Sequence, residues 1–152
     1  FFSRFIHILR VQCRVFMNVY RTKIRPLAGT DFREVRKKAF QLFDGIKQKS
    51  KRRTYLRSPY FGKEKIFLDL FWSHFFTASN PRDRMRRLPY LAPGLDLIRN
   101  NRFPPITKVN PNDKTILLHR FTGITDNTTF YVQIKEDIKT KQKFFISVFP
   151  EK

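Results

Sequence analysis

The sequence predicts an α+β protein in which helices come first and a small antiparallel sheet comes last. Two observations lead to this prediction. Between residues 32 and 46, apolar side chains recur every three or four positions, which is the spacing of one helix face. From Thr115 to Pro150, three runs rich in β-branched and aromatic residues alternate with short polar turns, which is the pattern of consecutive hairpins.

Charge and composition narrow the class of protein. The chain has 152 residues, 41% of them hydrophobic, which suits one domain or a small domain with an arm. Its net charge is +20, and residues 1–102 hold 24 of the 32 Lys and Arg. Such a field attracts polyanions, most commonly nucleic acid, although an acidic membrane surface or an acidic protein would also satisfy it.

Cysteine usage and hydropathy exclude several classes. The one cysteine, Cys13, cannot form an intrachain disulfide and fits a reducing compartment. The sequence contains no Cys/His cluster that would predict a metal site and no motif that would predict another cofactor. No stretch is long and apolar enough to span a bilayer.

The N-terminal third predicts two helices. Arg4, Arg10 and Arg14 follow helical spacing within residues 1–25, which predicts a basic amphipathic helix that docks on its own protein, a membrane or a phosphate backbone. Thr30 or Asp31 should cap the next helix. The basic run at 47–53 has no apolar residue, so we place the boundary there, between an extension over 1–54 and a domain over 55–152.

The middle of the chain predicts further helices. Apolar residues between 66 and 76 favour a helix from Gly62 to about Ser79, packed under the sheet. Pro81 should start a turn of helix that crowds four arginines together. Pro89 and Pro93 then interrupt the pattern, and residues 94–100 predict a short final helix.

The faces of the strands follow from alternation. In the second strand, Phe130, Val132 and Ile134 share the face expected in the core, while Tyr131, Gln133 and Lys135 share the other. In the third strand Phe144, Ile146 and Val148, the set that contains the β-branched residues, should face the core.

Register decides which polar side chains meet. In an antiparallel hairpin, the residue numbers of two directly opposed residues always add up to the same value. A sum of 254 in the first hairpin and of 282 in the second would place His119, Lys135 and Ser147 in one row across the sheet. A slip of one residue would instead carry Arg120 to that face, and a bulge would bring both there.

The runs LHRFTG, FYVQIKED and KFFISVFP, preceded by a segment ending in LDLIRN, resemble nucleases of phages and mobile elements in the barnase–EndoU–colicin–RelE superfamily. The resemblance covers about residues 55 to 151 and not residues 1–50. It implies an α+β fold with N-terminal helices packed on a small curved antiparallel sheet of three to four strands. It also implies a metal-independent ribonuclease, often a cytoplasmic toxin of a prokaryote or phage with an acidic antitoxin or immunity protein as partner.

The resemblance and the expected row together predict the site. His119 would act as general acid or base, Lys135 and Arg120 would stabilise the phosphorane formed by attack of the RNA 2′-hydroxyl, and Ser147 would orient the phosphate. The remaining residues expected to contact nucleic acid are aromatic, amide or basic: Tyr131, Gln133, Lys143, Phe145, Arg84, Arg86 and Arg87. The alternative is a module of a mobile element or toxin–antitoxin complex that binds nucleic acid without cleaving it.

Overall fold

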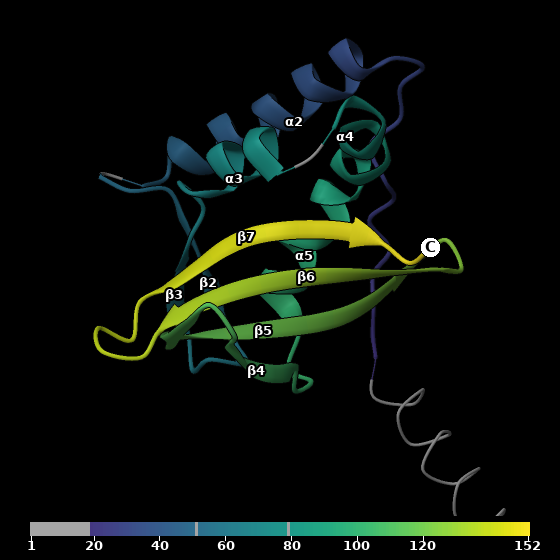
Figure 1. Ribbon diagram of the computed structural model, residues 1–152. Helices are drawn as coiled ribbons and strands as arrows, with labels where there is room; N and C mark the ends of the chain where they lie inside the picture. The colour runs from purple at the N-terminus through teal and green to yellow at the C-terminus, as the bar shows by residue number, and fades with distance from the viewer. Residues whose placement is uncertain (1–18, 51, 79) are drawn as a thin grey trace, which may run out of the picture.

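The computed structural model describes residues 19–50, 52–78 and 80–152, which form one mixed sheet with helices above and behind it (Figure 1). The helices are α2 (Phe32–Lys47), α3 (Phe71–Ala78), α4 (Pro81–Arg87) and α5 (Leu91–Asn100), with a short 3-10 helix η1 (Leu88–Tyr90) before α5. The strands are β1 (Tyr20–Arg21), β2 (Tyr55–Ser58), β3 (Glu64–Phe67), β4 (Ile106–Asn110), β5 (Asp113–Thr125), β6 (Thr128–Asp137) and β7 (Lys143–Pro150).

The predicted architecture of a small antiparallel sheet under N-terminal helices is wrong. The sheet has seven strands in the described part of the chain, in the order β1-β5-β6-β7-β3-β2, and β4 pairs with β5 as well. Two of its pairings, β1 with β5 and β3 with β7, are parallel. The sheet curls, because α5 packs against β5 and β6 and also against β2 from the far edge.

The helix expected from Gly62 to Ser79 is in fact a hairpin followed by a shorter helix. Gly62 and Lys63 both have a positive φ, and they turn β2 back into β3. Ile66 is buried in the resulting strand, and Phe71 and Phe75 are buried from α3. The apolar spacing over 66–76 fits one helix face, but it is divided between a strand and a helix.

Two helix starts are confirmed. Asp31 caps α2 by accepting a hydrogen bond from the backbone N–H of Glu34, as the sequence predicted. Pro81 starts α4 directly after the cap residue Asn80. By contrast, α5 begins at Leu91 rather than residue 94, because Pro93 lies in its first turn, where no intrahelical N–H is needed.

The helix expected over residues 1–25 lies mostly outside the described residues. Its last part is extended and forms β1 beside β5. The hydroxyls of Tyr20 and Thr22 both donate to the Asp96 carboxylate on α5, each at 2.6 Å. Burial and the neighbouring carboxylate raise the pKa of Tyr20 to about 12. These bonds fix the N-terminal strand to the helix inside the curl.

One core joins α2 to the sheet. Val35, Ala39 and Phe43 of α2 belong to the same buried cluster as Ile66 of β3 and Phe145 of β7. The predicted division after residue 54 therefore falls within residues that share a core. Among the described residues, no helix is both long and apolar enough to cross a bilayer.

The turn between β5 and β6 fixes which side chains share a face. Asp126 and Asn127 both have a positive φ, as a two-residue type I′ turn requires, and Thr125 pairs directly with Thr128. The number sum is therefore 253, and the predicted sum of 254 is wrong by one residue. The slip reverses the face of every β5 side chain relative to β6.

A β-bulge shifts the pairing register of β7 against β6 by one residue. Gln133 pairs with Ser147, but Ile134 pairs with Phe145, so Ile146 is the extra residue in β7. Phe145 and Val148 are consequently both buried, whereas Ile146 is half-buried. We call the core side of the sheet the inner face and the opposite side the outer face.

Gly123 provides a test of how tightly the inner face is packed. A Cβ atom at Gly123 would lie 2.5 Å from Cζ of Phe130 and 2.9 Å from Cδ1 of Leu97, both in buried residues. We expect Gly123→Ala to lower the free energy of unfolding by about 2 kcal/mol in urea denaturation. Gly45→Ala is the control, because a Cβ there meets nothing within 4 Å, and it should add about 1 kcal/mol of helix stability. Equal stability of the two variants would contradict this packing.

Candidate nucleic-acid interface

A polar row crosses the outer face over three strands. Arg120 of β5 pairs with Gln133 of β6, and Gln133 pairs with Ser147 of β7. Directly opposed side chains of neighbouring strands point to the same face, about 5 Å apart at Cβ. The one-residue slip therefore brings together three of the residues predicted to bind or cleave nucleic acid, with Arg120 in the place expected for His119.

Arg87 of α4 extends the row beyond β7. Its Nη1 atom lies 3.4 Å from the Ser147 hydroxyl, and its guanidinium lies 5.3 Å from the centre of the Phe149 ring. The Asp83 carboxylate one turn earlier forms an ion pair with Arg87, with Oδ2 lying 3.0 Å from Nε. The carboxylate remains charged because Arg86 and Arg87 keep the pKa of Asp83 below its ordinary value. The arginine is thus pre-positioned over the end of the row.

Two aromatic rings lie next to this row. Thr122, Tyr131 and Phe149 form the neighbouring row of the outer face, and the two ring centres are 5.4 Å apart. The Arg120 guanidinium lies 5.8 Å from the Tyr131 ring centre and 5.4 Å from that of Phe149. Burial, followed by the bond from Tyr131 to Glu151, raises the pKa of Tyr131, so the phenol stays protonated. We call Arg87, Arg120, Tyr131, Gln133, Ser147 and Phe149 the outer-face cluster.

His74 on α3 lies within electrostatic range of this cluster. Its pKa is lowered from the ordinary 6.5, first by loss of hydration and then by the charges of Arg87 and Lys135. Lys135 itself is on the outer face, two residues along β6 from Gln133. The lowered pKa favours the neutral form of the His74 imidazole at neutral pH.

The predicted row of His119, Lys135 and Ser147 does not form. His119 is buried on the inner face opposite Ile134, whereas Lys135 pairs with Leu118 and points outward. The His119 Nδ1 atom is 2.8 Å from the Thr107 hydroxyl of β4, and Nε2 is 2.9 Å from the Glu136 carboxylate. His119 and Lys135 are therefore separated by the sheet itself.

His119 belongs to a chain of polar contacts across the inner face. Glu136 also lies 3.8 Å from the Lys143 ammonium, which in turn pairs with Glu64 of β3. A carboxylate can only accept, so Nε2 of His119 carries a hydrogen and the Thr107 hydroxyl donates to Nδ1 when the ring is neutral. His119, Glu136 and Lys143 each have a polar partner within this network. The network therefore has a structural role, because it joins β4, β5, β6, β7 and β3.

Four further predicted contacts are placed elsewhere. Lys143 and Phe145 are buried on the inner face, where Phe145 stacks on Phe71 at 4.8 Å. Arg84 donates to the Phe76 carbonyl, and Arg86 bonds Asp83 and the Pro150 carbonyl. The inward position of Lys143 and Phe145 follows from the register and the bulge, so neither residue can contact a bound strand.

Sequence reasoning missed His74 and Phe149. His74 stands within an apolar run, which favoured a structural histidine, and its neighbours Arg87 and Lys135 are distant in sequence. Phe149 was expected to share a face with Phe145. Only the bulge at Ile146 separates the two rings. The positive charge of residues 81–87 was the one available signal for Arg87.

The described residues provide no group of three or more His, Cys, Asp or Glu side chains that could hold a metal ion. Comparison with protein-family models, curated proteins and solved structures gave no significant match. The resemblance to the nuclease superfamily thus stays a prediction.

His119→Ala distinguishes a structural histidine from a catalytic one. The variant leaves Glu136 without one of its partners, so we expect the free energy of unfolding to fall by about 2 kcal/mol in urea denaturation. Affinity for RNA, measured on folded protein by fluorescence anisotropy, should not change. Thr107→Val, which removes only the bond to Nδ1, should show a smaller loss of the same kind. Normal stability with lost RNA affinity would contradict the structural role.

Proposed function

We propose that the outer face of the sheet binds single-stranded nucleic acid, with RNA as the first candidate. The observation behind this proposal is the outer-face cluster, in which Arg87 and Arg120 stand beside the rings of Tyr131 and Phe149. Single strands are held by aromatic side chains that stack bases and by cations that follow the phosphates. A net charge of +20 adds long-range attraction to the same ligand.

The cluster favours a single strand over a duplex. Stacking on Tyr131 or Phe149 requires an exposed base face, which paired bases do not offer. Gln133 lies between the two arginine-bearing ends of the row and can donate to or accept from a base edge. The row thus combines phosphate contacts, a stacking surface and one amide.

Arg120→Ala should weaken binding of a single-stranded oligonucleotide by about tenfold, because it removes a phosphate partner on the outer face. The slope of log affinity against log salt should become shallower by about 0.7, the value for one phosphate contact on a single strand. Fluorescence anisotropy over a series of salt concentrations measures both quantities. Tyr131→Ala should also weaken binding, with little change in the salt slope.

Arg33→Ala is the matched control for lost charge. Arg33 is exposed on α2, which lies apart from the outer face (Figure 1). Similar losses of affinity for the Arg33 and Arg120 variants would contradict a localised site, because they would reduce the interaction to net charge.

A second candidate function, metal-independent cleavage of RNA, is favoured by the imidazole of His74 on α3, whose pKa is lowered by loss of hydration and by the charges of Arg87 and Lys135. In this mechanism His74 accepts the proton of the 2′-hydroxyl, and the 2′-oxygen forms a bond to phosphorus. Arg87 and Arg120 hold the non-bridging oxygens as charge develops. The bond to the 5′-oxygen then breaks, and that oxygen takes a proton from Lys135, which leaves a 2′,3′-cyclic phosphate and a 5′-hydroxyl.

The pH profile tests this second candidate. A base acts only when deprotonated, so cleavage should rise with pH through the lowered pKa of His74, with its midpoint below the ordinary 6.5 of a histidine. His74→Ala should reduce cleavage by about a hundredfold with EDTA present and leave binding intact. His119→Ala is the control, with cleavage by folded protein expected to persist. Cleavage that is absent from wild-type protein, or unchanged in His74→Ala, would leave binding as the only function proposed.

A further inference from the structure

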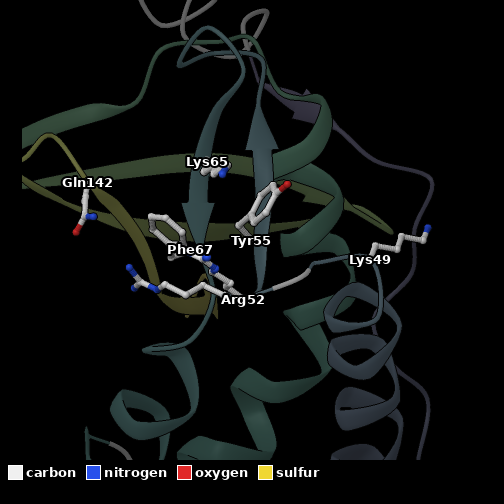
Figure 2. A pocket seen from close by; sticks show the side chains of 7 residues that line it. Lys49, Arg52, Tyr55, Lys65, Phe67 and Gln142 are labelled. Carbon is white, nitrogen blue, oxygen red and sulfur yellow. The ribbon is translucent and has the colours of Figure 1, made fainter.

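A cationic pocket of about 580 Å³ opens between the end of α2 and the β2–β3 hairpin. Its walls carry the four cations Lys49, Arg52, Arg53 and Lys65, and its rings are Tyr55 and Phe67 (Figure 2). That volume is within the range of sites for small organic ligands. The described lining contains no acidic side chain, so the pocket suits an anion with an aromatic part.

The rings of the pocket lie on the outer face. Lys135 pairs with Phe144, Phe144 with Phe67, and Phe67 with Tyr55. Since directly opposed side chains share a face, these four residues form one row across β6, β7, β3 and β2. The row begins at Lys135, next to the outer-face cluster, and ends in the pocket. The two sites are therefore parts of one surface.

Arg53 is held as a flat platform in this row. Its guanidinium lies 3.9 Å from the centre of the Phe67 ring and 5.5 Å from that of Phe144. Nε and Nη2 of Arg53 both bond Oδ2 of Asp69, at 3.0 and 2.8 Å, which fixes the plane. A guanidinium plane held in this way is a surface on which a nucleobase can stack.

The other three cations have no acidic partner in the described part of the chain. Lys49, Arg52 and Lys65 take part in none of its ion pairs, whereas Arg53 is paired with Asp69. Lys65 also lies 4.7 Å from the centre of the Tyr55 ring, so ring and ammonium are presented together. Unpaired cations beside an aromatic ring favour a phosphate attached to a base.

We propose that this pocket is a second subsite, which holds one nucleotide of the strand bound at the outer-face cluster. The base stacks on Tyr55 or on the Arg53 guanidinium, and the phosphate contacts Lys49, Arg52 and Lys65. The inference rests on the proposed function, because it extends that ligand to a longer site. Tyr131 and Lys135 are four residues apart along β6, and Tyr55 on β2 is three strands from β6, so the two tyrosines are separated by about 20 Å along the sheet.

The test compares short and long oligonucleotides on the full chain. We expect an oligonucleotide of about twelve nucleotides to bind more tightly than one of about four, because only the longer one reaches both sites. The double variant Arg52→Gln with Lys65→Gln should lower affinity for the long oligonucleotide by about tenfold and leave the short one unchanged. The control Arg33→Gln with Lys37→Gln removes two exposed charges from α2 and should alter neither affinity. Lys49→Gln with Arg52→Gln, which changes only exposed residues after α2, replaces the first variant if that variant fails to fold.

Each contrary outcome has its own meaning. If Arg120→Ala weakens binding but the pocket variant matches its control, the second subsite fails and the proposed function remains. If neither weakens binding, the proposed function fails with it. A further outcome is that adenosine 5′-monophosphate binds the pocket while the pocket variant binds the long oligonucleotide as tightly as its control does. This result would assign the pocket to free nucleotides and overturn the proposal. Competition by polyglutamate as strong as that by unlabelled oligonucleotide would overturn it too, in favour of an acidic protein partner.

Discussion

The two-residue turn at Asp126 and Asn127 determines the chemistry of both sheet faces. A type I′ turn needs positive φ at both central residues, and it admits only one pairing of the strands that leave it. With Thr125 opposite Thr128, His119 enters the core and Arg120 faces outward. The pairing then continues without a bulge from Thr125 back to Ile116, so the alternation of side chains carries these roles along both strands. The turn therefore places Arg120 on the same face as Tyr131 and Gln133.

The bulge at Ile146 determines in the same way which face the aromatic side chains of β7 occupy. Without an extra residue, Phe145 and Phe149 would share one face of β7. The bulge buries Phe145 against Phe71 and leaves Phe149 outside beside Tyr131. It also brings Ser147 into line with Gln133 and within reach of Arg87. One inserted residue therefore supplies the core with a ring and the outer surface with another.

Local patterns in the sequence predicted some of this structure and could not have predicted the rest. The helical spacing and the Asp31 cap gave α2, and the hairpin pattern gave β5, β6 and β7. The Asp-Asn pair was a usable signal for the register, since both residues tolerate positive φ. The parallel pairing of β3 with β7 joins segments far apart in the chain, and the apolar spacing over 66–76 fits a helix equally well. The candidate site depends on these distant pairings, which no local pattern encodes.

The place of β7 within the sheet has a consequence for biosynthesis. This strand lies between β6 and β3, so it joins an N-terminal half of the outer face to a C-terminal half. Translation delivers residues 143–150 well after the cations of the pocket and after Arg87. During synthesis the N-terminal and C-terminal parts of the outer face therefore stay unconnected until residues 143–150 have left the ribosome and paired between β6 and β3.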